Sequence, residues 1–155
     1  MTNNDVFRRL KYAFNYTPED LISFFNHVGV VVEKEQISKY LEKDTKEVEN
    51  LSLEDEQFAH FLNGLIIHYR GKKEGEIPVA EKELNNNIVL RKLRIALNLK
   101  DTDILALLKT VEFNFGKSEL SAFFRKPGHH HYKRCQDQVL RNFLNALYLK
   151  NNPKK

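Results

Sequence analysis

The sequence is poor in residues that build disulfide frameworks or long flexible segments: it has one cysteine, six glycines and four prolines among 155 residues. The single cysteine, Cys135, excludes an intramolecular disulfide and a zinc site made of thiolates alone. No apolar run approaches the roughly 18 residues that cross a bilayer, and the opening MTNNDVFRRL lacks the charged-then-apolar order of a signal peptide. We therefore expect a cytoplasmic protein with no membrane partner.

The common catalytic motifs are also missing, including glycine-rich phosphate loops, His-Glu-x-x-His and Gly-x-Ser-x-Gly. Cys135 follows closely on the run His129-His130-His131, so a thiol nucleophile with a histidine base is one interpretation. We prefer a buried structural cysteine, because the internal repeat described below relates this position to Leu53. The sequence therefore predicts a protein that is not an enzyme and has no cofactor.

The three consecutive histidines also raise the question of a metal site, since imidazole is a common ligand of zinc, copper and nickel. Consecutive side chains seldom converge on one ion, however. The positive charges of Lys133 and Arg134 close by would repel a cation. We expect no bound metal.

The main feature that the sequence does contain is an internal duplication. Sliding the chain by 83 residues places Asn3 on Asn86 and gives 12 identities over residues 3–43, and after a one-residue gap an offset of 82 places Asp55 on Asp137. Matched apolar positions recur at helical spacing, four helices to each half. The predicted fold is therefore all-α, with two tandem four-helix repeats packed together as one pseudo-symmetric unit. The expected boundaries are a first repeat over 1–71, a linker over 72–85, a second repeat over 86–151 and a disordered tail over 152–155.

Local signals predict where several helices begin. Thr17, followed by proline and two acids, is typical of a helix start. Asn4 and Asn87 are interpreted as caps of the first helix in each repeat. The third helices are expected over residues 33–43 and 117–126.

Several polar residues of the first repeat have an identical partner in the second: Asn3, Asn4, Arg8, Asn15, Asp20, Asp55 and Asn63. Helix caps and ion pairs held between helices explain such repetition, because loss of either destabilises a fold. The alternative is a pseudo-symmetric pair of binding sites, one in each repeat, lined by Arg8 and Arg91.

The two halves differ in charge. Residues 1–71 carry 8 basic and 12 acidic side chains, a net charge of −4, whereas residues 72–155 carry 17 basic and 9 acidic side chains, a net charge of +8. Basic residues flank the loop over 127–132, while its first-repeat counterpart over 43–49 has three acids and two lysines. Because both repeats are expected to share a fold, folding does not require this difference. It indicates either an anionic partner for the second half or ordinary surface charge that keeps the protein in solution.

Three motifs together resemble one known family. They are the paired helix starts of pattern NN-x-x-x-R-[RK]-L-[KR], the segment ELSAFFR at 119–125 and the segment DQVLRNFL at 137–144. These resemble the YehS-like family, a bacterial tandem-repeat family of unknown function, over nearly the whole chain. The resemblance implies a bacterial cytoplasmic protein of similar length, and it implies no activity.

The basic cluster of the second half predicts a non-enzymatic protein that binds nucleic acid, and RNA in particular. Lysine and arginine contact phosphates, while histidine and tyrosine stack on unpaired bases. The residues predicted to bind nucleic acid are Arg91, Lys92, Arg94, Arg125, Lys126, His129, His130, His131, Tyr132, Lys133, Arg134 and Arg141. The alternative is a protein-interaction module or homo-oligomer, in which the acidic half of one molecule meets a basic surface.

Overall fold

The computed structural model describes residues 1–43, 45, 50–72 and 77–153, and its regular elements are all helices. In chain order they are α1 (Asn3–Phe14), α2 (Pro18–Asn26), α3 (Lys34–Leu41), α4 (Asp55–Arg70), α5 (Asn86–Ala96), α6 (Asp101–Thr110), α7 (Lys117–Ala122) and α8 (Asp137–Asn151). Four of them precede the predicted linker and four follow it. The all-α prediction with four helices in each repeat is confirmed.

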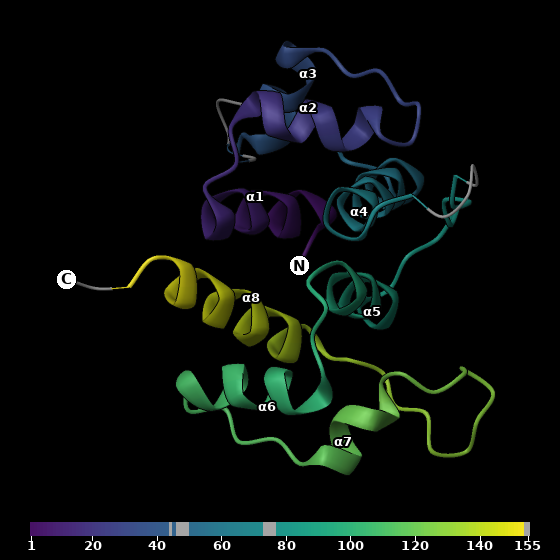
Figure 1. Cartoon of the computed structure of the whole chain (residues 1–155), viewed down its shortest axis with the longest axis vertical. Helices are drawn as coiled ribbons and strands as arrows, with labels where there is room; N and C mark the ends of the chain where they lie inside the picture. Colours follow the sequence, from purple (N-terminus) through teal and green to yellow (C-terminus); the bar gives the residue numbers. More distant parts are fainter. Residues whose placement is uncertain (44, 46–49, 73–76, 154–155) are drawn as a thin grey trace.

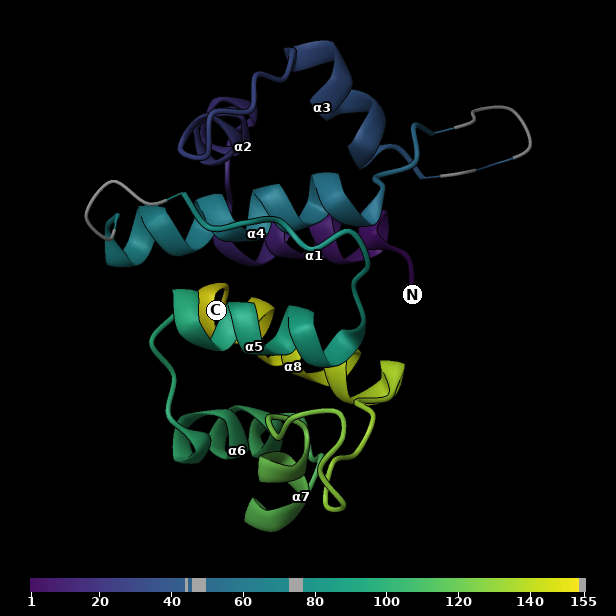
Figure 2. The same cartoon turned by 90° about the vertical axis from the view of Figure 1, so that its right-hand side faces the viewer.

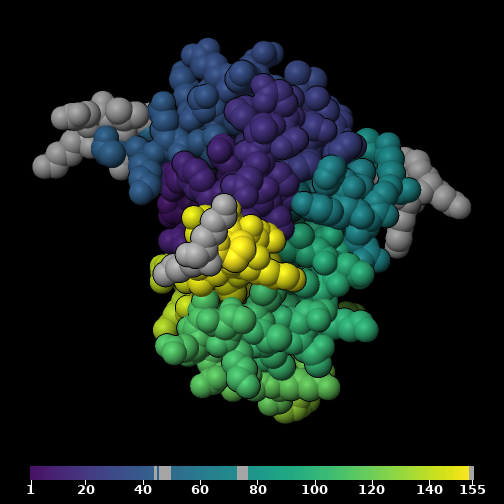
Figure 3. Space-filling model, turned by 60° about the vertical axis from the view of Figure 1, so that its left-hand side comes forward, coloured from purple at the N-terminus to yellow at the C-terminus, as the bar shows by residue number. Residues whose placement is uncertain are grey.

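The eight helices lie in layers, as Figures 1 and 2 show. α1 and α4 form one central layer and α5 and α8 form the next, while α2 and α3 cover one end and α6 and α7 the other. The two repeats meet through α1 against α8 and α4 against α5. Figure 3 shows the first of these contacts at the surface, where the C-terminal helix in yellow lies against the N-terminal helix in purple.

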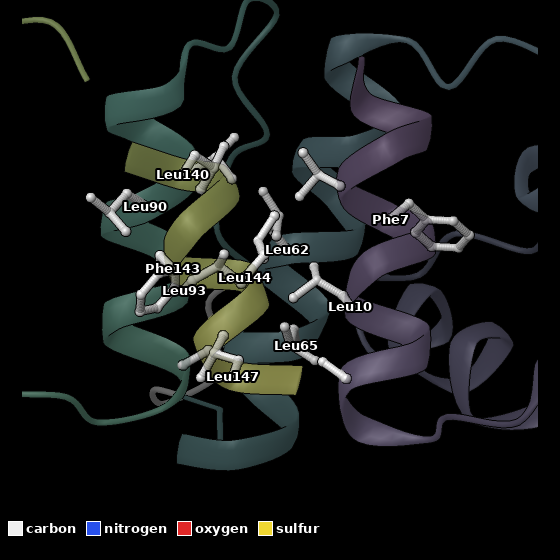
Figure 4. Packing of buried hydrophobic residues seen from close by; sticks show 14 of the residues in the cluster. Phe7, Leu10, Leu62, Leu65, Leu90, Leu93, Leu140, Phe143, Leu144 and Leu147 are labelled. Atoms are coloured by element: carbon white, nitrogen blue, oxygen red, sulfur yellow. The ribbon is translucent and has the colours of Figure 1, made fainter. Parts of the chain in front are cut away.

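The two repeats share one continuous hydrophobic core. Figure 4 shows Leu10 of α1 and Leu62 and Leu65 of α4 on one side, with Leu144 and Leu147 of α8 on the other. All five side chains are at most 3% exposed. Each amphipathic central helix therefore buries its apolar stripe against both its own repeat and the other one, which gives the single pseudo-symmetric unit predicted from the sequence.

The helix starts partly follow the sequence signals. Thr17 caps α2 as predicted: its hydroxyl accepts a hydrogen bond from the Asp20 amide, and the Asp20 carboxylate accepts one from the Thr17 amide. The caps of α1 and α5 are Thr2 and Asn85, so the interpretation of Asn4 and Asn87 as caps was wrong. α7 ends at Ala122, earlier than predicted, because the next residues form tight turns, in which the amides of Phe123 and Phe124 donate to the carbonyls of Leu120 and Ser121.

The second asparagine of each pair instead ties a loop to the first helix of its repeat. The Asn4 amide donates to the carbonyls of Tyr40 and Leu51, and its oxygen accepts from the Leu53 amide. The Asn87 side chain repeats all three bonds in the second repeat, with the corresponding residues Phe123, Lys133 and Cys135. Both asparagines are under 8% exposed. These bonds confirm the register of the duplication, including its one-residue gap.

The first asparagine of each pair holds the aspartate that begins the fourth helix of its repeat. Asn3 donates to Asp55 at 2.7 Å, and Asn86 donates to Asp137 at 2.7 Å. Asp137 also accepts from the N-terminal amine of Met1 at 2.7 Å, and this contact with the Asn86 bond lowers the pKa of its carboxyl. The interpretation of these repeated residues as structural is confirmed for both pairs.

Two repeated asparagines end helices. Asn15 and Asn98 follow α1 and α5 with φ angles of 56° and 53°, in the left-handed region that asparagine tolerates better than most residues. The turn after the second helix also needs a positive φ in each repeat. Gly29 provides it with φ 77°, whereas the corresponding residue of the second repeat is Glu112, with φ 59°.

This difference makes Glu112→Gly a stabilising change. A side chain other than glycine, asparagine or aspartate in the left-handed region costs about 1–2 kcal/mol, and part of that gain is offset by the larger entropy of an unfolded glycine. We expect the free energy of unfolding in urea to rise by about 0.5–1 kcal/mol. The matched change Gly29→Ala should lower it, and a neutral or destabilising Glu112→Gly would contradict this account of the turn.

The ends of the two repeats are only partly described. Residues 73–76 of the predicted linker, residues 44 and 46–49 of the first-repeat loop, and residues 154–155 of the predicted tail lie outside the described residues. Asn152, which the sequence placed in the tail, caps α8 and its amide donates to the carbonyl of Ala13 at 3.2 Å. This bond adds to the contact between α1 and α8.

Candidate nucleic-acid interface

The loop that carries most of the predicted binding residues runs from the end of α7 to the start of α8 (Figure 1). Asn87 fixes both of its ends, as described above, and the Lys133 amide donates to the carbonyl of Ala122. Two turns shape its tip: the His129 amide donates to Lys126, and the Tyr132 amide donates to His129. The backbone of the loop is therefore held in place while its charged and histidine side chains remain exposed.

A groove of about 1170 Å³ lies beside this loop. Five of the predicted binding residues line it, three of them cationic, and all five are exposed: Arg125, His130, His131, Lys133 and Arg134. α7, the 113–115 connector and the first turn of α8 supply the other walls. One acidic residue, Glu119, also lines the groove, and its carboxylate accepts a hydrogen bond from the Gly116 amide at the start of α7. The charge along the groove is therefore mainly positive.

Five further predicted residues are described outside the lining of this groove. Lys126, His129 and Tyr132 belong to the same loop, while Arg91 is exposed on α5 and Arg141 is exposed on α8. The structure places them on the second repeat, as predicted, and it does not bring them into the groove.

Lys92 does not belong to any exposed surface, which corrects its inclusion among the binding residues. It is 8% exposed, and its ammonium donates to Asn63 on α4 at 2.6 Å and pairs with Glu81 at 3.0 Å. A buried charge needs such partners, so Lys92 joins the two repeats instead. Its counterpart Arg9 is exposed, which is why the duplication did not reveal this role.

Arg94 is also engaged within the protein. Its guanidinium pairs with Asp101 at 3.0 Å, donates to the carbonyl of Leu99 and lies over the ring of Phe124, 4.6 Å from the ring centre. These contacts link α5 to the start of α6 and to the turn after α7. The charge of Arg94 is therefore largely neutralised before any partner arrives.

Sequence reasoning missed the aromatic wall of the groove. Phe113 and Phe115 are partly buried and line it, and their rings stack with centroids 5.6 Å apart at an interplanar angle of 15°. Phe115 stacks in turn on the buried Phe123, with centroids 5.4 Å apart at 20°. The sequence did hold a signal: the duplication aligns Phe113 and Phe115 with Val30 and Val32, so the two repeats differ here as they do in charge.

The charge contrast between the repeats is sharpest at the groove. The register fixed by Asn4 and Asn87 aligns Arg125 with Glu42, Lys133 with Leu51 and Arg134 with Ser52. The first repeat makes the same asparagine bonds, and none of these three positions in it carries a cation.

The three histidine rings cluster at the tip of the loop. His129 and His130 stack, with ring centroids 4.6 Å apart at 15°, whereas the ring of His131 is tilted against both, with its centroid 4.0 Å from that of His130 and 5.5 Å from that of His129. Nδ1 of His129 accepts a hydrogen bond from the His131 amide, which removes one metal-binding lone pair. Over the described ranges, no three histidine, cysteine or acidic side chains are grouped so that they could bind a metal ion.

Cys135 is a core residue, as the duplication with Leu53 indicated. It is 5% exposed, and burial, with a smaller contribution from the nearby charge of Asp137, raises the pKa of its thiol to about 12. Because the thiolate is the nucleophilic form, this environment disfavours reaction at Cys135.

The contacts of Arg8 and Arg91 differ, which argues against the alternative of two equivalent arginine-lined sites. Arg8 donates to the carbonyls of Leu41 and Glu42 at the end of α3 and pairs with Asp5. It lines a second hollow, of about 1080 Å³, at the starts of α1 and α5, where basic and acidic side chains are mixed. Arg91 is exposed and lies outside that hollow, so the two arginines do not form a symmetric pair of sites.

None of the helices in the described residues is long and apolar enough to span a membrane.

Comparisons with known proteins agree with the duplicated architecture. The model of a family described as "Protein of unknown function (DUF1456)" matches residues 3–71 and 86–152, which fall within the two repeats apart from Asn152. The chain is 38% identical over 156 residues to the uncharacterized protein YehS of Escherichia coli strain K12, covering 100% of this chain and 99% of that protein. No solved structure matches significantly. The resemblance to the YehS-like family is thereby confirmed.

Proposed function

Because the chain belongs to the DUF1456 family, whose function is unknown, we propose a function from its own groove: it is a non-enzymatic cytoplasmic protein that binds RNA through the second repeat. The interface is the groove beside the 123–136 loop, and its phosphate-binding groups are Arg125, Lys133 and Arg134. Lys126 at the edge of the loop adds a fourth cation.

One observation carries this proposal, the difference in charge between the corresponding loops of the two repeats. Both repeats have four helices and tie their loops with the same asparagine bonds, yet the first has Glu42, Leu51 and Ser52 where the second has the cations Arg125, Lys133 and Arg134. Since folding does not require this charge difference, we explain it by electrostatic attraction of an anionic partner. Exposed arginine and lysine side chains at a held loop suit phosphate groups, because the loop gives up little conformational freedom on binding.

The number of cations at the groove determines the affinity that we expect. Three or four phosphate contacts are what these cations can make, and each contact to a single strand contributes a slope of about −0.7 to the dependence of log affinity on log salt. We expect binding that tolerates many sequences, on the order of micromolar at low salt and much weaker near physiological ionic strength.

The test replaces Arg125, Lys126, Lys133 and Arg134 with alanine and measures binding to a labelled RNA oligonucleotide by fluorescence anisotropy over a series of salt concentrations. The variant should lose most of its low-salt affinity and nearly all of the salt slope, because its phosphate contacts are gone. Its melting temperature should stay within a few degrees of the parent's, since all four residues are exposed. The matched control replaces Lys43 and Lys46 of the first repeat and should leave binding unchanged.

Two results would overturn the proposal. One is the absence of RNA binding by the parent at low salt, and the other is an equal loss of affinity in both variants. Either result would favour the alternative, a protein-interaction module or homo-oligomer. The oligomeric state, measured as the mass of the protein in solution across the same salt series, would be the first test of that alternative.

A further inference from the structure

We propose that the groove takes unpaired bases, one of which stacks on Phe113 at the open end of the ladder of rings Phe123, Phe115 and Phe113. This inference rests on the proposed function and specifies its substrate class as single-stranded rather than duplex RNA.

The ladder has one closed and one open end. Phe123 is 5% exposed and anchors the ladder in the core, and Phe115 lies between it and Phe113 with both ring pairs within 20° of parallel. Among the described aromatic side chains, Phe113 contacts only Phe115. A planar base that continues the ladder therefore has one ring to stack on, and that ring lines the groove.

The first repeat shows that the fold does not need these rings. Val30 and Val32 occupy the corresponding positions, and Val32 is 4% exposed. The 113–115 connector follows α6 as the 30–32 connector follows α2, so the second repeat has exchanged aliphatic side chains for partly exposed aromatic ones at the same backbone positions. Aromatic residues in place of valine, and cations in place of Glu42, Leu51 and Ser52, meet at one groove.

The combination favours a single strand because of where its bases are. In an RNA duplex the base faces are covered by their neighbours, and the major groove is too deep and narrow for side chains to read. In a single strand the bases turn away from the backbone, so the phosphates can meet Arg125, Lys133 and Arg134 while a base reaches Phe113. A stacked base raises affinity by roughly 5- to 150-fold, whereas phosphate contacts alone favour the more densely charged duplex.

The experiment compares three probes with the full-length parent at low salt by fluorescence anisotropy: a 12-nucleotide RNA strand, the same strand as a duplex, and a strand of equal length whose residues lack bases. The intact strand should bind at least about tenfold more tightly than the other two. If all three bind equally, the stacking inference is wrong while the proposed function stands. If none binds, the proposed function itself is wrong.

Variants then locate the stacking surface. Phe113→Val, which introduces the residue that the first repeat uses, should lose about tenfold in affinity for the intact strand and leave the strand without bases unaffected. Phe113→Tyr keeps a ring and should retain the parent's affinity, which separates stacking from any loss of fold. Phe14→Val, at a partly buried ring of the first repeat, is the matched control and should not change binding. Unchanged affinity of a folded Phe113→Val would overturn the assignment of the base to this ring.

Discussion

Gly64→Ala is expected to lower the free energy of unfolding by more than about 3 kcal/mol, which corresponds to a fall in melting temperature of roughly 6–12 °C. Gly64 lies in the middle of α4, where it faces the backbone of α2. A Cβ atom added there would lie 1.8 Å from the carbonyl oxygen of Phe24 and 2.6 Å from its carbon. Because these are backbone atoms, the clash cannot be relieved by a change of rotamer, and α2 would have to move away from α4.

The second repeat provides the control for this change. Ala146 occupies the corresponding position in α8 and is 1% exposed. Ala146→Gly should cost only about 1 kcal/mol, the usual effect of glycine within a helix. Thermal unfolding followed by circular dichroism at 222 nm measures both. A Gly64→Ala protein that melts within two degrees of the parent would contradict the close packing of α2 on α4.

Asn87→Ala is expected to lower the free energy of unfolding by about 3 kcal/mol and to abolish most of the affinity for RNA. The change removes three hydrogen bonds and leaves the buried amide of Cys135 and the carbonyls of Phe123 and Lys133 without their partner. Freed at both ends, the loop that presents Arg134 would have to be ordered again each time RNA binds. Hydrogen exchange of the Cys135 amide should quicken along with the loss of stability.

Asn4→Ala separates the two effects. It removes the same three bonds in the first repeat, so its cost in stability should be similar. Its affinity for RNA, measured at a temperature where both variants remain folded, should equal the parent's. A similar loss of binding in both variants would mean that the asparagines affect binding only through global stability.

Much of the fold could be predicted from the sequence because each pattern in one repeat could be checked at the corresponding positions of the other. Apolar positions that match at helical spacing in both halves predicted eight helices, and the leucine partner of Cys135 predicted its burial. The predictions that were wrong concerned residues whose local sequence is compatible with two structural roles. An asparagine near a helix start reads as a cap, but Asn4 and Asn87 point into the repeat and bond to a loop that is distant in sequence.

The candidate site was predicted in part for a related reason. Sequence proximity grouped Arg125, Lys133 and Arg134, and the structure places all three along one groove because one loop joins them. It also included Lys92, whose burial depends on Asn63 and Glu81 in other elements. Composition cannot tell an exposed lysine from one that closes an interface between repeats. The stack of Phe113 and Phe115 was missed because aromatic residues in a segment between helices are usually explained by packing against those helices. Only the structure shows that both rings line a groove.

The most direct measurement of the central claim, that RNA binds at the groove of the second repeat, is photochemical crosslinking with mapping of the site. The purified full-length protein would be irradiated with a 4-thiouridine-containing single strand at low salt, digested and examined by mass spectrometry for peptides that carry a nucleotide. We expect crosslinks within 113–134 and none within the corresponding residues 30–52 of the first repeat. Crosslinks distributed equally between the two repeats, or none at all, would contradict the account.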